Sequence, residues 1–453
     1  MYTTAWLISA LLMPSAEPAL AAWHVPACHH RLPLTAGADR APVGRRTPIV
    51  ITGEDLYRLA GAVQVAVDSI RLVGPDGKPR AMQVDQRDRT GRLGQDDNAR
   101  LDYDDEIAFV VDYPESASAT YWLYWDKESV SASISTEPTI EIDRDTGIEY
   151  VDVSLDNGSF WVGLKGSSSD TPTKNQLTNY GRGGITELKL HGKPFTNIRS
   201  SYGFHPVRHP FGSGPGDCKW SLPKVVARGP IRTVVEMVCD DFKVLDDKKQ
   251  PTVRGRVIHE WALYENLPVL DARMLFTYKA TMDHWSAGFA FPMYVGGPID
   301  GHESLFVPLL DSACRVAVPE DFRDAWYPTL YQTPVPEEGW FAWTDAPEKH
   351  GLAVFYERMA TIRKRATWVS HRPAHNPEVR IRLTPNETTE NNVTWRHRRL
   401  SGTDQLRYEL RLVGLSSDDG VAIRTAYHIW ASPIEEGLSV GFPETLRQHG
   451  LGD

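Results

Sequence analysis

The sequence predicts an all-β protein, with a small N-terminal β-barrel-like domain followed by a large antiparallel two-sheet sandwich. Two observations support this fold class. Short runs of alternating apolar and polar residues, bounded by Gly, Pro, Asn and Asp, recur along most of the chain. The 453 residues, of which 41% are hydrophobic and 24% charged, are enough for a large core and for two or three domains of ordinary size.

The first 22 residues have the pattern of a secretory signal peptide. An apolar run from Ala5 to Met13 is followed by Pro14 and by small residues around Ala21. We expect cleavage after Ala21 or Ala22 and a secreted or periplasmic protein. No later stretch reaches the ~18 consecutive apolar residues of a membrane span, so no membrane span is expected.

Residues 45–128 are expected to form the small β-domain. A Pro75-Asp76-Gly77 turn separates two strands in SIRLVGPDGKPRAMQVDQ, and the segments DEIAFVVD and ATYWLYWD add two more. One short helix is expected near Glu54 to Ala60. The Ser-rich segment 127–138 lacks an apolar period and is predicted to be a linker.

Residues 139–440 are expected to form the large sandwich. The segment RGRVIHEWALYENLPVLDARMLFTYK predicts a long hairpin with one apolar and one polar face. Such a hairpin packs its apolar face against a second sheet. A helix is expected in this part only at PETLRQHG, close to the end of the sequence.

Several of these segments resemble a known family. The segments MQVDQRD, LDYDDEIAFVVDYP and YWLYWD are similar, in this order, to the small N-terminal module of exo-rhamnogalacturonan lyase-like proteins. The segments RGPIRTVVEM and HEWALYENLPVLDARMLF resemble the galactose-mutarotase-like supersandwich that follows it. The resemblance covers residues 45–435 and implies that fold. Members of the family continue into a helical toroid, which this sequence does not show, so no catalytic residue is carried over.

Charge and motifs narrow the expected partners. The formal net charge is −10 and the basic residues are scattered, which argues against nucleic acid as a partner. The sequence contains no nucleotide-binding P-loop, no G-x-S-x-G elbow and no H-E-x-x-H zinc motif, and no cofactor is expected. The resemblance favours a polysaccharide or oligosaccharide substrate, which the chemistry below predicts to be anionic.

The segment SSYGFHPVRHPFGSGPGDCKW, residues 200–220, is the first candidate site. β-Elimination of a uronic acid needs a base, an acid and a cation that stabilises the carboxylate. Tyr202, His205, Arg208 and His209 offer all three within eight positions. We expect this segment to form a loop over the open face of the sandwich.

Two other interpretations of this segment stay open. The histidines could hydrogen-bond the loop backbone and have only a structural role. They could also hold zinc together with Asp217 or Asp283, although histidines four residues apart suit a metal best on a helix, which this segment cannot form.

The second candidate is the interruption Asp283-His284-Trp285 between two predicted strands. His284 joins the candidate catalytic residues, and Trp285 offers an aromatic face to the C–H face of a sugar. We expect this interruption to lie near the first candidate. The alternative for this interruption is a core tryptophan beside a histidine that caps a turn. Trp220, Trp340 and Trp343 are further stacking candidates.

The polar face of the long hairpin is the third candidate. Its arginines, Arg254, Arg256 and Arg273, are expected to bind a carboxylated sugar. Cross-strand pairs with Glu260 and Asp271 on a solvated face would explain the same pattern. Alternation places His259 and Trp261 on the opposite face, where His259 is expected to be a core residue.

Four cysteines remain after the expected cleavage: Cys28, Cys218, Cys239 and Cys314. An even number in an exported chain permits two disulfides, and Cys218 with Cys239 is the preferred pair because it closes a short loop. Four buried thiols are the alternative.

These observations predict a polysaccharide lyase that cleaves a uronic-acid-containing glycan by β-elimination. A glycoside hydrolase that uses two carboxylates, for which Asp283 and Glu260 are available, is one alternative. A non-catalytic glycan-binding protein is the other.

Overall fold

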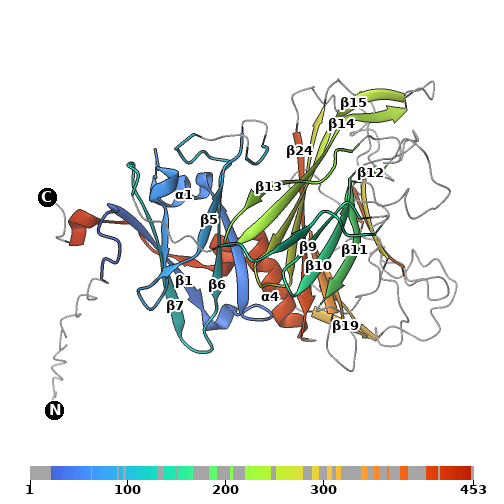
Figure 1. Ribbon diagram of the computed structural model, residues 1–453. Coiled ribbons are helices and arrows are strands. Elements are labelled where there is room, and N and C mark those ends of the chain that lie inside the picture. Colours follow the sequence, from blue (N-terminus) through green and yellow to red (C-terminus); the bar gives the residue numbers. More distant parts are fainter. Residues whose placement is uncertain are drawn as a thin grey trace, which may run out of the picture.

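The computed structural model is an antiparallel β-protein with few helices, as predicted. It describes residues 22–62, 64–88, 91–94, 98–130, 137–148, 151–166, 183–190, 205–207, 220–245, 251–278, 288–294, 304–308, 313–317, 338–344, 351–356, 365–366, 378–385, 405–416 and 419–449. Figure 1 shows the N-terminal strands on one side of the molecule, the long strands on the other, and α4 between them. The signal peptide, the linker and the domain boundaries remain predictions.

The N-terminal part contains two small sheets. The first has the order β25-β1-β7-β3-β4, with β26 also paired to β1. Its strands are β1 (His30–Gly37), β3 (Arg71–Val73), β4 (Pro79–Arg80), β7 (Ser118–Trp125), β25 (Ser439–Val440) and β26 (Glu444–Thr445). The second has the order β2-β6-β5, formed by β2 (Arg46–Thr52), β5 (Met82–Asp85) and β6 (Glu106–Asp112).

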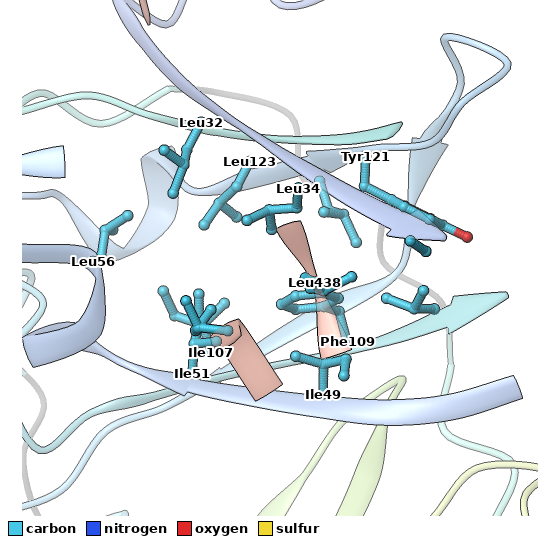
Figure 2. Close-up of a cluster of buried hydrophobic side chains, with 14 of the residues drawn as sticks. Leu32, Leu34, Ile49, Ile51, Leu56, Ile107, Phe109, Tyr121, Leu123 and Leu438 are labelled. Carbon is cyan, nitrogen blue, oxygen red and sulfur yellow. The ribbon is translucent and has the colours of Figure 1, made fainter. Parts of the chain in front are cut away.

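A hydrophobic core fills the space between these two sheets (Figure 2). Alternation along β6 directs Ile107 and Phe109 into this core, while Ala108 belongs to a different cluster on the other face of the strand. Leu438, near the C-terminal end, packs among the N-terminal strands in the same core. The sheet β2-β6-β5 is therefore covered on both faces.

The short helix expected near Glu54 to Ala60 is confirmed as α1 (Gly53–Ala60). Thr52 and Asp55 form a capping box at its start, because each side chain bonds the backbone N–H of the other. The helix ends at Gly61, whose φ of 61° places it in the left-handed region that glycine tolerates best. Two short 3-10 turns, η1 (Ala38–Arg40) and η2 (Val67–Ser69), connect other strands of this part.

The large part is built around a nine-stranded sheet of order β13-β14-β15-β16-β24-β21-β20-β18-β19. Its strands are β13 (Lys224–Arg228), β14 (Arg232–Leu245), β15 (Pro251–Tyr264), β16 (Val269–Tyr278), β18 (Ser304–Pro308), β19 (Ala313–Ala317), β20 (Trp340–Thr344), β21 (Gly351–Tyr356) and β24 (Gln405–Leu415). The long hairpin predicted from the sequence is confirmed as β15 and β16.

Two four-stranded sheets complete the large part. One has the order β11-β10-β9-β8, with β8 (Glu141–Asp143), β9 (Val153–Asp156), β10 (Phe160–Lys165) and β11 (Gly184–Leu190). It packs on the nine-stranded sheet where Phe160 and Leu190 meet Gly414 of β24. The other has the order β12-β17-β23-β22, with β12 (His205–Val207), β17 (Gly288–Tyr294), β22 (Arg365–Ala366) and β23 (Glu378–Pro385).

The C-terminal segment differs from the prediction. A 12-residue helix, α4 (Gly420–Ala431), precedes a π-helical turn, η4 (Pro433–Gly437), where the sequence predicted no helix. The expected helix in PETLRQHG is only a 3-10 turn, η5 (Leu446–His449). Asp419 caps α4 by accepting hydrogen bonds from the backbone N–H groups of Val421 and Ala422. After α4 the chain returns to β1, and Figure 1 shows it there beside the N-terminal strands.

Candidate functional site

The first two candidate segments meet in one sheet. Strand β12 pairs with β17, so that His205 lies opposite Ala290 and Val207 lies opposite Gly288. Strand β12 belongs to the first candidate segment, and β17 begins three residues after Trp285. The pairing therefore brings the backbones of both candidate segments to the same place in the fold.

Arginines lie on the next strand of this sheet. Strand β23 pairs with the other edge of β17, with Arg382 opposite Ala290 and Arg380 opposite Pro292. His205, Ala290 and Arg382 thus form one row across three strands. The other predicted residues of the two segments lie outside the described residues: Tyr202, Arg208, His209, Asp217, Asp283, His284 and Trp285.

The tryptophans proposed to stack on a sugar are buried where they are described. Trp220 is 6% exposed and its ring lies 4.5 Å from that of His259. Trp340 is 1% exposed and donates a hydrogen bond of 2.9 Å to Glu338. As placed, neither ring offers an open face to a glycan. The side chain of Trp343 is not among those described.

His259 is a core residue, as predicted. It is 1% exposed, contacts the carbonyl oxygen of Gly183 through Nδ1, and packs against the rings of Trp220 and Trp261. The pairing of β15 with β16 confirms that His259 and Glu260 lie on opposite faces.

The polar face of the hairpin is buried, not solvated as the alternative interpretation supposed. Glu236, Glu260, Arg273 and Glu409 lie side by side across four neighbouring strands, from β14 to β24. Glu236 and Glu260 are buried, at 2% and 3% exposure. The sheet β2-β6-β5 covers this face and contributes Glu106 to it. A face that is polar in the sequence is therefore an internal interface.

The arginines proposed to bind a carboxylated sugar are paired within the protein. Arg273 lies 2.5 Å from Glu106, 3.4 Å from Glu260 and 2.6 Å from Glu409. Arg256 lies 3.0 Å from Asp240. The side chain of Arg254 is outside the described part of β15.

Four further arginines extend this network. Arg87 donates hydrogen bonds of 2.9 and 2.8 Å from two N–H groups to Glu260. Arg92 binds Glu236 in the same way, at 3.0 and 2.5 Å. Both glutamates lie on the nine-stranded sheet. Two-point pairing of this kind is the strongest geometry of an Arg–carboxylate bond. Two arginines of the large part also bind carboxylates: Arg232 binds carboxylates of the N-terminal part, and Arg411 binds one within the nine-stranded sheet. Arg232 binds Asp85 at 2.8 Å and Glu106 at 2.5 Å, and Arg411 binds Asp271 at 2.6 and 2.7 Å.

Glu260 has a raised pKa in this network. Burial raises its pKa to about 7; the charges of Glu106 and Glu236 add to this, and Arg87 opposes it. Burial also raises the pKa of Tyr264, whose hydroxyl donates a 2.6 Å hydrogen bond to Asp271. Asp85 and Glu106 raise the pKa of Arg232 although its burial opposes this. A carboxyl group that titrates near neutral pH is typical of sites that transfer protons, and it also occurs in structural networks.

A cleft of about 320 Å³ opens beside this network. We call it the interlayer cleft, because it lies between the sheet β2-β6-β5, the nine-stranded sheet and the segment 429–435. Glu260 and Arg87 belong to its buried lining, while the side chains of Asp271 and Glu409 are 21% and 23% exposed. The sequence carries no signal for this cleft, because its walls come from segments more than 300 residues apart.

Two observations on the described parts of the chain concern metals and membranes. Among those residues, no three His, Cys, Asp or Glu side chains gather in a way that would hold a metal ion. None of the described helices combines the length and apolar character needed to cross a bilayer.

The predicted disulfide is only half described. Cys239 is fully buried on β14, and Trp220, two residues after Cys218, forms an antiparallel bridge to Cys239. Cys218 itself lies outside the described residues, so the pair stays a prediction.

Comparison with known proteins gives no family. No family model matches the sequence, and no curated protein matches it. Among solved structures, an α-mannosidase from Enterococcus faecalis is similar with a TM-score of 0.45 and 10% identity, over 93% of this chain and 46% of the mannosidase. A glycosyl hydrolase family 38 protein from the same organism has a TM-score of 0.42 and 9% identity, over 91% of this chain and 47% of that protein. The chain thus spans about half the length of these two proteins.

A third similar structure is smaller. A protein described as an aldose 1-epimerase from Klebsiella pneumoniae matches with a TM-score of 0.37 and 11% identity, over 64% of this chain and 86% of the epimerase. At such scores and identities, the likeness does not establish an activity for this chain. None of these three proteins is described as a rhamnogalacturonan lyase.

Proposed function

We propose that this chain is an exported polysaccharide lyase that cleaves a uronic-acid-containing glycan by β-elimination. The observation that supports the proposal is the pairing of β12 with β17, which joins the two segments richest in candidate catalytic residues. A shared site requires this proximity, and a fold with the two segments at opposite ends would have excluded it.

The roles follow from the chemistry of the reaction. A base removes the proton at C5 of the uronic acid, a cation stabilises the enolate that forms, and an acid protonates the leaving glycosidic oxygen. We assign proton transfer to His205, His209, His284 and Tyr202, without choosing among them, and charge neutralisation to Arg208. Arg380 and Arg382 of β23, which sequence analysis did not select, are further candidates for the cation because of their register in the sheet. Trp285 is assigned to sugar stacking.

The described arginines favour this location over the polar face of the hairpin. Arg256 and Arg273 are engaged by protein carboxylates, so a carboxylated sugar would have to compete with Asp240, Glu106 and Glu409 for them. We therefore place the anionic substrate at the sheet β12-β17-β23 rather than on the nine-stranded sheet.

A comparison of substrates and variants tests this proposal. Arg208→Ala is expected to weaken binding of carboxylated oligosaccharides and to leave the binding of methyl-esterified ones nearly unchanged. Arg45→Ala, at an exposed position of the N-terminal part, is the matched control. Equal effects of Arg208→Ala on charged and esterified substrates would contradict the assigned role.

A further inference from the structure

We propose that the interlayer cleft is a second binding site, which takes a neutral sugar residue. This inference does not rest on the proposed lyase activity, and the cleft shares no described residue with the sheet β12-β17-β23-β22. It rests instead on the size, charge and walls of the cleft.

The size of the cleft suits a small ligand. Its volume of about 320 Å³ lies at the lower end of the range for ligand pockets and has room for roughly one or two pyranose residues. It is also preformed, because its floor is the hydrogen-bonded network around Glu260 and Arg87. A ligand would therefore not have to order the protein when it binds.

The charges that line the cleft favour a neutral ligand. Six carboxylates and five guanidinium groups face each other there: Asp55, Glu106, Glu260, Asp271, Glu409 and Glu435, with Arg58, Arg87, Arg232, Arg273 and Arg411. The four arginines of the floor already bind carboxylates, so the described lining of the cleft has no excess of cations for an anionic sugar. Neighbouring donors and acceptors match sugar hydroxyl groups, because each hydroxyl both donates and accepts hydrogen bonds.

The wall formed by the end of α4 adds an apolar surface. Trp430 lines the cleft, and its ring is held 6.1 Å from Phe355 and 6.3 Å from Tyr427. An oriented aromatic ring suits the C–H face of a pyranose. In Figure 1, α4 lies between the N-terminal strands and the long strands, which places this wall at the junction of the two parts.

The rim of the cleft includes an unusual backbone segment. The π-helical turn Pro433–Gly437 follows α4 directly and contributes Pro433, Ile434 and Glu435 to the lining. π-Helical turns are rare and occur frequently at functional sites. Across the opening, Arg58 of α1 lies 3.8 Å from Glu435, and both side chains are largely exposed. Such a weak exposed pair costs little to separate when a ligand enters.

A blocking substitution tests the inference. Ala431 lines the cleft and Val421, on the same helix, is 66% exposed. Saturation-transfer NMR on the full chain, with methyl glycosides of glucose, galactose, mannose and rhamnose, is expected to detect binding of at least one of them. Ala431→Trp is expected to remove that signal, and Val421→Trp to preserve it. Ser432→Tyr, at the same wall, replaces Ala431→Trp if the latter does not fold.

Galacturonate serves as the charged probe in the same experiment. A galacturonate signal that survives Ala431→Trp belongs to another site and agrees with the inference. The inference is overturned if no neutral glycoside binds the wild-type protein, if the blocking variants bind it equally well, or if they remove a galacturonate signal of similar strength. None of these results depends on whether the protein has lyase activity.

Discussion

Arg87 and Glu260 connect two layers of the fold: two N–H groups of the Arg87 guanidinium donate hydrogen bonds of 2.9 and 2.8 Å to the two carboxylate oxygens of Glu260. Arg87 follows strand β5 of the N-terminal part, and Glu260 lies on β15 of the large part, 173 residues later. Both side chains are almost fully buried, at 5% and 4% exposure. The pair therefore belongs to an internal interface and not to a solvated surface.

Removal of one partner is expected to destabilise the protein strongly. Arg87→Met leaves the buried Glu260 without its two-point partner, and a loss of about 3–5 kcal/mol in the free energy of unfolding is expected. Urea unfolding measures this loss. The control is Arg46→Met, whose partner Asp112 is exposed, and which is expected to leave stability nearly unchanged. If Arg87→Met unfolds at the same urea concentration as the wild type, the role given to this pair is contradicted.

The acidity of Glu260 predicts the pH dependence of stability. Its pKa is raised from the ordinary value of 4.5 to about 7 in the fold, so the folded state binds the proton more tightly than the unfolded state. Stability from this group is therefore fully present below the unfolded pKa and is lost as the pH rises through about 7. Glu260→Gln cannot ionise and should not show this contribution.

Chemical denaturation of both proteins between about pH 5 and about pH 8 measures the effect. The stability of the wild type relative to Glu260→Gln is expected to fall across this range. A constant difference, or a rise, would show that Glu260 does not titrate there.

The C-terminal segment is expected to be needed for the N-terminal core. Leu438 is fully buried in the core between the two small sheets, more than 300 residues from the N-terminal strands that surround it (Figure 2). Leu438→Ala is expected to cost about 2–5 kcal/mol of stability, because it leaves a cavity in a packed core. Phe442→Ala, at a position 91% exposed, is the control and should change the melting temperature little. If both variants melt alike, the C-terminal segment does not complete this core.

The disulfide between Cys218 and Cys239 remains to be tested by peptide mapping. We expect a linked peptide pair in the non-reduced, exported protein and its loss on reduction. Such a bond typically contributes ~2–4 kcal/mol, so reduction should also lower the melting temperature. Recovery of the Cys239 peptide as an unlinked thiol, from protein purified from the medium or periplasm, would contradict the pairing.

The sequence predicted the elements whose local pattern agrees with their environment. The alternation around His259 predicted both the hairpin and the face on which this histidine is buried. The helix α1 was predicted, and Thr52, Asp55 and Gly61 supply local start and stop signals for it. In these cases local preference and tertiary packing favour the same structure.

Helix α4 was missed because its local pattern is ambiguous. Apolar or aromatic residues occupy every second position from 421 to 429 except position 425: Val421, Ile423, Tyr427 and Ile429. This alternation is typical of a strand. Packing decides instead, because Ile423 and Tyr427 enter one core and Ile429 another. The cap at Asp419 was the available signal for a helix.

The environment of the hairpin's polar face could not be predicted from the hairpin alone. Nothing in the residues around Glu260 shows that a sheet from residues 46–112 covers them. The partners Arg87 and Glu106 lie in a distant segment, and only the tertiary structure brings them to this face. For the same reason the interlayer cleft has no signature in the sequence.

The absorbance of the reaction products in the ultraviolet tests the central proposal most directly. β-Elimination leaves an unsaturated uronic acid that absorbs there, so incubation with pectic, alginate, ulvan and glycosaminoglycan substrates is expected to raise the absorbance with at least one of them. His205→Ala is expected to slow that reaction by ~10²-fold or more if His205 transfers the proton, with an unchanged melting temperature. The control is His24→Ala, at an exposed position of the N-terminal part. New reducing ends without any rise in absorbance would show a hydrolase, and glycan binding without either signal would show a non-catalytic protein; each result would contradict the proposal.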